Sequence, residues 1–295
     1  MPEPLGDIEE GLRLEKSGML DRALAHYEAA TENADPLTVA TAWRRRASVL
    51  RTRCDWDGAL AAARESAAVA VRHGLINAHA EALNAQAAVF QSQGDFASAT
   101  PLLERILEMT KDPRIRGVAL QNLGTVEAER GDYETAEHRF LESYRCFKAA
   151  DYQWGQAFAL NNYGRAAMDR ENFEIAERVL TRAVELAREI EDLDLAALAT
   201  MNLAETMLSA NELERADEAA STALGYFEMV GNRWRRVECL RLLGDINRRD
   251  GQLEVAHRCY TQGLALAREL GVQLEISRLE DRLRSEEKLN ASGER

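Results

Sequence analysis

Side-chain amides recur along the chain at intervals of 38 to 40 residues, and their type and spacing suggest a binding chemistry. They are Asn84, then Gln121 and Asn122, then Asn161 and Asn162, then Asn202. An amide both donates and accepts hydrogen bonds, so a series of amides on one face can pair with the main chain of an extended peptide. Alternatively, the amides hold a stack of helices in register, since an unpaired buried polar group costs about 1 to 3 kcal/mol. The two roles are compatible, and the sequence leaves both open.

Arginines form a second set of candidate binding residues, because a guanidinium grips carboxylates or phosphates with paired hydrogen bonds. Residues 1–36 carry a net charge of −6, whereas residues 37–75 carry +4. The candidate arginines are Arg44, Arg45, Arg51, Arg165, Arg241, Arg248 and Arg249. Four carboxylates accompany them: Glu129, Asp169, Glu205 and Asp245. Local ion pairs on a solvated face are the alternative interpretation for each arginine.

Searches for catalytic and metal-binding patterns return no candidate. The five histidines are isolated and have no metal-ligand spacing with the cysteines. The sequence contains no phosphate-binding GxxxxGK, no HExxH and no nucleophile elbow. We therefore expect no metal, no cofactor and no enzymatic activity.

Pairs of amphipathic helices must position these side chains. Before a turn at residues 130–133, Leu120, Leu123 and Gly124 have the spacing of one helix face, and after it Ala136 and Phe140 do the same. Each helix has one stripe to bury, and two lone helices cannot bury both outer flanks. Copies of the hairpin must therefore stack on each side, as in a repeat protein.

Seven such hairpins follow one another, each marked by an alanine that opens the stripe of its second helix. These alanines are Ala23, Ala59, Ala99, Ala136, Ala176, Ala216 and Ala256. The predicted repeats lie near 4–37, 38–77, 78–114, 115–154, 155–194, 195–234 and 235–270. A capping helix is predicted over 272–285, with Leu274, Ile276, Leu279 and Leu283 as its apolar stripe, and a frayed tail over 286–295. We predict one continuous all-α solenoid over residues 1–285.

Local signals predict how the helices begin and end. Gly18, Gly94, Gly131, Asn172, Asn211 and Gly251 are expected to end the first helices in the left-handed conformation. Asp55, Asp95 and Asp132 are expected to cap the second helices. Because Pro101 would remove a hydrogen bond inside a helix, its helix is expected to start late, near Ser98.

Composition favours a helical protein packed through small residues, with 46% hydrophobic and 29% charged residues and only 6% aromatic residues. We expect neither a signal peptide nor a membrane span, because no long apolar run occurs, and we expect a cytoplasmic location. The scattered Cys54, Cys146, Cys239 and Cys259 are expected to be buried thiols. A net charge of −13 argues against nucleic acid as a partner.

The hairpins resemble the tetratricopeptide repeat, whose pattern is met by Leu120, Leu123, Gly124, Tyr133, Ala136 and Phe140. The period of about 40 residues departs from the usual 34 of that repeat. Longer repeats of this kind are similar to those of kinesin light chains, bacterial quorum-sensing peptide receptors and bacterial ATPase-type transcriptional regulators. The resemblance implies a right-handed superhelix whose first helices line a concave groove. It further implies that the candidate amides, arginines and carboxylates given above face this groove.

These observations predict a non-catalytic scaffold or adaptor that binds another protein or an extended peptide, with acidic groups as candidate ligands, in bacterial signalling or regulation. A receptor for a small ligand or signal peptide is one alternative, and a self-associating module, such as a homodimer, is another. Trp154 and Trp234 occupy equivalent places before first helices. They either anchor a partner or pack into the adjacent loop between repeats.

Overall fold

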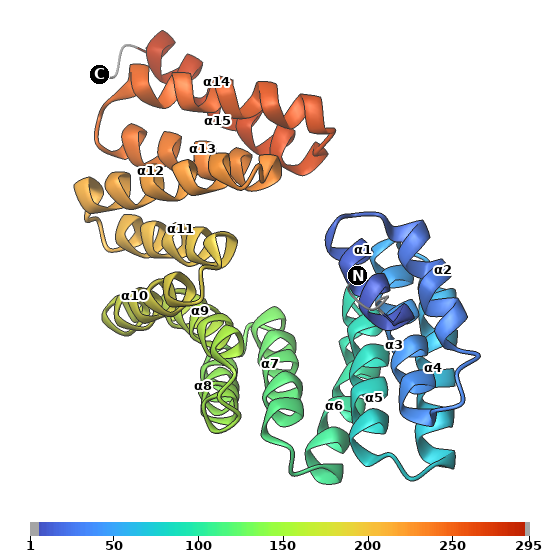
Figure 1. The fold of residues 1–295 in the computed structure, drawn as a ribbon. Helices are drawn as coiled ribbons and strands as arrows, with labels where there is room; N and C mark the ends of the chain where they lie inside the picture. The colour runs from blue at the N-terminus through green and yellow to red at the C-terminus, as the bar shows by residue number, and fades with distance from the viewer. Residues whose placement is uncertain (1–5, 293–295) are drawn as a thin grey trace. The chain divides into compact units, whose positions relative to one another are not determined.

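The structure is a computed structural model that describes residues 6–292, with side chains described as far as residue 285. All regular elements among these residues are α-helices, which confirms the all-α class (Figure 1). The helices group into two compact units, Met1–Tyr152 and Gln153–Arg295. No helix among the described residues has the length and the apolar character that crossing a membrane requires.

The first unit contains eight helices among its described residues. They are α1 (Asp7–Lys16), α2 (Leu20–Ala30), α3 (Pro36–Thr52), α4 (Trp56–Arg72), α5 (Ile76–Ser92), α6 (Phe96–Met109), α7 (Pro113–Glu129) and α8 (Tyr133–Ala149). Each odd-numbered helix pairs with the helix that follows it, and α3, α5 and α7 also contact one another in succession. This is the helix-pair stack expected of a solenoid.

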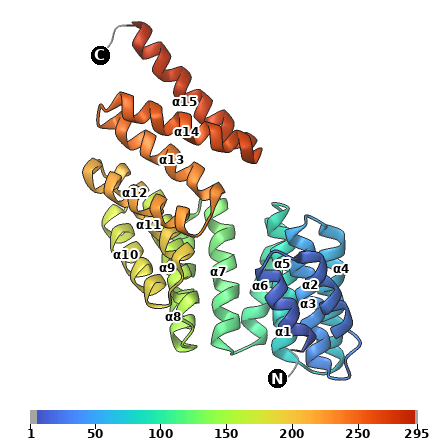
Figure 2. The ribbon, with the colours of Figure 1, turned by 45° about the horizontal axis from the view of Figure 1, so that its top comes forward.

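The described part of the second unit continues the same pattern with six paired helices and a final single helix. They are α9 (Gln153–Asp169), α10 (Phe173–Glu189), α11 (Leu193–Ser209), α12 (Leu213–Met229), α13 (Arg233–Arg249), α14 (Leu253–Leu270) and α15 (Gln273–Ser292). The helix α15 lies against α14 and also contacts α13 (Figure 2). Within residues 6–292 there are therefore seven helix pairs and a terminal helix, as predicted.

Small residues of the first helices pack against large side chains of the second helices. The seven marker alanines, from Ala23 to Ala256, are all fully buried. A Cβ built on Gly124 would lie 2.6 Å from Cε1 of Phe140. The same close approach joins Gly244 to Tyr260, sixteen residues later in the chain as for Gly124 and Phe140. The glycines thus allow an aromatic ring to pack directly on a helix backbone.

Helix termini follow the predicted chemistry in most repeats. The side chains of Asp55, Asp95 and Asp132 accept hydrogen bonds from the backbone amides of Gly58, Ser98 and Thr135 at 3.0 to 3.1 Å, which confirms the three caps. The left-handed conformation is confirmed for the predicted residues Gly18, Gly94, Gly131, Asn211 and Gly251.

The expectation for Asn172 was wrong by one residue. Glu171 has the positive φ of 60°, and Asn172 is the N-cap residue of α10. The residue in the left-handed conformation is therefore Glu171, one residue before the expected Asn172.

The expectation for Pro101 was also wrong, because α6 begins at Phe96 and holds the proline inside the helix. Proline lacks the amide that would donate to the carbonyl of Ala97. Both Ala97 and Pro101 are exposed, so water can hydrate that carbonyl. The lost hydrogen bond therefore costs less than it would on a buried face.

Two further expectations about burial were wrong. Only Cys239 is buried, whereas Cys54 is exposed and Cys146 and Cys259 are intermediate. Cys54 has a φ of 59° and takes the turn position that glycine occupies in other repeats, which carries it outward. On α15, Leu279 is buried as predicted, but Leu274 is 62% exposed because it stands at the start of the helix.

Candidate functional site

Three of the predicted arginines gather in one pocket of the first unit. Arg44, Arg45 and Arg51 project from α3, together with Ser48, and α5 contributes Glu81 and Asn84. Ala47, Ala85 and Ala88 complete the lining, and the volume is about 150 Å³. We call this site the arginine pocket.

Helix periodicity explains why these residues converge. On α3, Arg44, Ser48 and Arg51 are separated by four and then three residues, so they share one face. On α5, Glu81, Ala85 and Ala88 have the same spacing. Because α3 and α5 are successive first helices in contact, the two faces form opposite walls of the arginine pocket.

Positive charge exceeds negative charge in the arginine pocket. Arg44 Nε lies 3.4 Å from Glu81 Oε2, and this carboxylate is the acidic group in the lining. Arg51 donates a hydrogen bond to the neutral hydroxyl of Ser92 at 3.3 Å. Arg45 Nε is buried and has no hydrogen-bond partner among the described residues. Burial lowers the pKa of Arg44, although the charge of Glu81 opposes that shift.

The amides of the first unit bond to one another across repeats. Asn122 Nδ2 donates to Asn84 Oδ1 at 2.7 Å, and Gln91 Nε2 donates to the carbonyl of Asn122 at 2.9 Å. Gln121 is buried, and its Oε1 accepts a hydrogen bond from the hydroxyl of Ser143 at 3.3 Å. These contacts hold α5, α7 and α8 together, which favours the register role of the amides.

The amides of the second unit are bonded in the same way. Asn202 Nδ2 donates to Asn161 Oδ1 at 2.8 Å, and Asn161 Nδ2 donates to Asn162 Oδ1 at 3.1 Å. Asn202 is fully buried and Asn161 is 2% exposed. Neither side chain presents its amide to solvent, so their hydrogen bonds serve the packing of α9 against α11.

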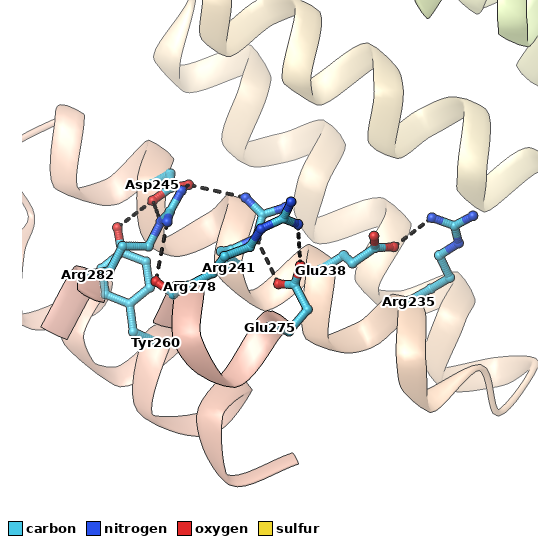
Figure 3. Close-up of polar contacts among 8 residues, drawn as sticks. All are labelled: Arg235, Glu238, Arg241, Asp245, Tyr260, Glu275, Arg278 and Arg282. Carbon is cyan, nitrogen blue, oxygen red and sulfur yellow. Dashed lines mark hydrogen bonds and ion pairs between the residues drawn. The ribbon is translucent and has the colours of Figure 1, made fainter. Parts of the chain in front are cut away.

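Arg241 of the second unit is already engaged with acidic side chains (Figure 3). Its Nε lies 3.0 Å from Glu275 Oε2, and its Nη1 lies 3.6 Å from Asp245 Oδ2. Arg278 pairs with Glu275 at 2.6 Å, and Arg282 grips both oxygens of Asp245 at 2.6 and 2.8 Å. We call these five residues the end network, because they fasten α15 to α13. Arg241 is therefore already paired with two carboxylates.

Sequence reasoning named Arg241 and Asp245 but missed the three members of the end network that lie on α15: Glu275, Arg278 and Arg282. Glu275 is only 2% exposed although it stands beside the exposed Leu274, so hydrophobic periodicity gave no sign of its burial. Tyr260 contributes a further hydrogen bond from its hydroxyl to Asp245 Oδ1 at 2.8 Å. A signal was available in the arginines of α15, which recur at Arg278 and Arg282 on one helix face.

The remaining predicted residues of the second unit lie on exposed or mixed surfaces. Arg248 is exposed and lines a hollow of about 650 Å³ with Asp245, Arg249 and Arg282. Arg165 is exposed and lies near the carboxyls of Asp169 and Glu205, whose pKa values are raised by burial in spite of its charge.

Burial is the largest influence on these two carboxyls, and it raises the pKa of both. Besides Arg165, the charge of Arg241 also lowers the pKa of Glu205, whereas Glu238 and Asp169 raise it. The second unit thus combines both signs of charge on its first helices. Glu129, in the first unit, is exposed.

The two tryptophans differ in how they pack. Trp154 Nε1 donates to Asp192, in the loop before α11, at 3.0 Å, and its ring stacks on Phe158 with centroids 5.0 Å apart. The guanidinium of Arg235 lies over the ring of Trp234, with its Cζ 4.6 Å from the ring centroid. Both side chains remain about 40% exposed. The hydrogen bond to Asp192 is the predicted contact with an adjacent loop, and it is present at Trp154.

Comparison with known proteins agrees with this architecture. A family model for the tetratricopeptide repeat matches residues 8–74 and 163–228, which confirms the repeat recognised in the sequence. No curated protein sequence matches the chain.

Three solved structures represent the groups named from the sequence. A Rap protein in complex with competence and sporulation factor is 17% identical, with a TM-score of 0.67, and the match covers 92% of this chain and 79% of that one. A STAND signal-transduction ATPase with a tetratricopeptide-repeat sensor, from Pyrococcus horikoshii, is 13% identical, with a TM-score of 0.71. The match covers 92% of this chain and 44% of that one. Kinesin-light-chain-like repeats from Podospora anserina are 14% identical, with a TM-score of 0.55. The match covers 64% of this chain and 94% of that one. At these identities the likeness establishes the fold.

Proposed function

We propose that this chain, an array of tetratricopeptide repeats, is a non-catalytic scaffold that binds an extended segment of another protein on its first helices. The arginine pocket carries this proposal. Three guanidinium groups and an amide line one pocket, and a single carboxylate faces them. Arginine enrichment in a partly desolvated concavity is typical of the residues that dominate protein recognition.

The structural neighbours support binding rather than catalysis. A Rap protein of the same fold is in complex with competence and sporulation factor, and the STAND protein uses its repeats as a sensor. By analogy, we propose an adaptor or sensing role in bacterial signalling and a cytoplasmic location. A homodimer is a further proposal that light scattering of the purified chain tests directly.

Selection from a random-peptide library tests the binding function. We expect the wild-type chain to enrich peptides that a variant with Arg44, Arg45 and Arg51 all changed to Gln does not bind. The matched control changes three exposed arginines of the second helices to Gln, so the net charge is the same: Arg64, Arg72 and Arg105. The control should retain binding, since its changes lie outside the arginine pocket.

Melting temperatures of both variants close to the wild-type value show that the fold is intact. Failure to enrich any peptide would contradict the proposed function. Equal loss of binding in the pocket variant and in the control would also contradict it, because general charge would then explain the result.

A further inference from the structure

We infer that the arginine pocket receives an acidic side chain of the bound segment, and that Glu81 occupies the place of that carboxylate in the unliganded protein. This inference rests on the proposed binding function and names the chemistry of the partner. It also assigns to Glu81 a role as an internal competitor for the site.

The pocket offers hydrogen-bond donors to a ligand. Asn122 donates to Asn84 Oδ1 at 2.7 Å, which fixes the orientation of the Asn84 amide and leaves its NH₂ group as the available end. The three guanidinium groups carry donors alone, and Ser48 adds a hydroxyl that can donate. A ligand group that accepts several hydrogen bonds and carries negative charge complements this set.

One carboxylate, Glu81, lines the pocket beside three arginines, and the charge of Glu15 acts on Arg44 from outside the lining. The contact of Arg44 with Glu81, at 3.4 Å, is longer than the ~2.7–2.9 Å of a strong charge-assisted hydrogen bond. Arg51 bonds to a neutral hydroxyl. The Nε of Arg45 is buried, so a ligand in the pocket would pair with the terminal nitrogens of that guanidinium. A second carboxylate would pair with Arg51 and with this end of Arg45.

A comparison with the end network shows that the pairing at Glu81 is open. In both places an arginine of one first helix meets a glutamate of the next, as Arg44 meets Glu81 and Arg241 meets Glu275. The side chain of Glu275 is 2% exposed and also holds Arg278, whereas that of Glu81 is 41% exposed. Glu81 can therefore turn into solvent when a ligand arrives, while Glu275 cannot.

The size of the pocket suits one side chain. A water molecule takes up about 30 Å³ of the liquid, so the volume of about 150 Å³ has room for about five water molecules. An aspartate or glutamate head group with its methylene carbons fits this space against the floor of Ala47, Ala85 and Ala88. The pocket lies along the C-terminal half of α3, where a chain can pass over it without ending there.

The experiment uses a fluorescein-labelled peptide enriched by the wild-type chain and measures its Kd by fluorescence polarisation. Three changed peptides accompany it: one with each Asp and Glu replaced by Asn and Gln, one with an amidated C-terminus, and one with phosphoserine at the acidic position that contributes most. The protein variants are E81Q, the Arg45→Gln and Arg51→Gln double variant, and the Arg64→Gln control.

We expect replacement of the acidic residues by amides to weaken binding to the wild-type chain about tenfold, and to change binding to the double variant less than twofold. E81Q should bind the acidic peptide at least threefold more tightly, because the competing carboxylate is gone, and should bind the neutral peptide unchanged. An E81Q melting temperature close to the wild-type value confirms that the effect is local.

Four outcomes would overturn the inference. They are equal affinity for the acidic and neutral peptides, unchanged affinity in E81Q, loss of affinity on C-terminal amidation alone, and a phosphoserine peptide that binds more than tenfold more tightly than the acidic one. The last two would assign the arginine pocket to a chain end or to a phosphopeptide. The proposed function survives each of them, since a peptide is still bound. It fails if the library yields no peptide, or if the triple pocket variant and its control lose binding equally.

Discussion

Replacement of Asn202 by Ala is expected to destabilise the second unit by about 1 to 3 kcal/mol, because it leaves a buried acceptor without a donor. Asn202 is fully buried, and its Nδ2 supplies a hydrogen bond at 2.8 Å to Asn161 Oδ1. Asn161 is itself 2% exposed, so water cannot readily replace the lost donor.

The repeat itself offers a double variant that should recover most of this loss. Forty residues after Asn161 and Asn202 stand Met201 and Leu242, each 3% exposed. The chain therefore already accepts apolar residues at these two positions of the repeat. Asn161→Met combined with Asn202→Leu removes both buried amides, including the Asn202 Oδ1 that has no partner among the described residues. Removal of both partners can be nearly neutral where removal of one is costly.

Urea unfolding followed by far-ultraviolet circular dichroism measures these effects, with each single variant completing a double-mutant cycle. The half-buried Asn162 serves as the control, and Asn162→Ala should cost less than Asn202→Ala. A single Asn202→Ala variant within about 0.5 kcal/mol of the wild type would refute the reasoning, because exposed substitutions commonly have effects of that size. A double variant that loses the sum of the two single losses would refute it as well.

Two further predictions concern packing and pH. Gly244→Ala should destabilise the fold by about 1 to 3 kcal/mol, because the new Cβ would collide with the ring of Tyr260; Gly225→Ala, which has no atom within 4 Å of the new Cβ, should stabilise it by about 0.5 to 1 kcal/mol in the same urea assay. Burial raises the pKa of Glu205, so ionisation of this carboxyl opposes folding at neutral pH. Glu205→Gln should therefore raise the thermal midpoint at pH 7, and the gain should vanish as the pH falls below about 4.3, the ordinary glutamate pKa; a gain that persists at low pH would contradict this cause.

Local rules made most of the fold predictable. The caps at Asp55, Asp95 and Asp132 depend on residues within one helical turn, and the marker alanines depend on helix periodicity. Expectations failed where the outcome depended on which face meets solvent. Pro101 remains inside α6 because the lost hydrogen bond lies on an exposed face. The expectation of a late helix start did not take the exposure of that face into account.

The candidate site was predictable to the extent that its residues share a helix. Arg44, Arg45 and Arg51 were expected on one side of α3, and they line one pocket. Arg241 was expected on an equivalent side of its own helix, but its availability depends on Glu275, which lies 34 residues later in the chain. The docking of a terminal helix cannot be read from spacing within a repeat, so the end network was not foreseen.

The contrast between Glu81 and Glu275 follows from what their displacement would cost. To free Arg241, an acidic ligand must displace Glu275, whose side chain is 2% exposed. The displaced carboxylate would then either stay buried without a partner or become hydrated only if α15 moved. Breaking such a buried ion pair costs about 3 to 5 kcal/mol, which is most of what a weakly bound peptide gains. The side chain of Glu81 is 41% exposed, so its carboxylate can be hydrated when a ligand carboxylate takes over the pairing with the half-buried Arg44. Of the two arginine–glutamate pairs, the one in the arginine pocket is therefore where an acidic ligand can compete.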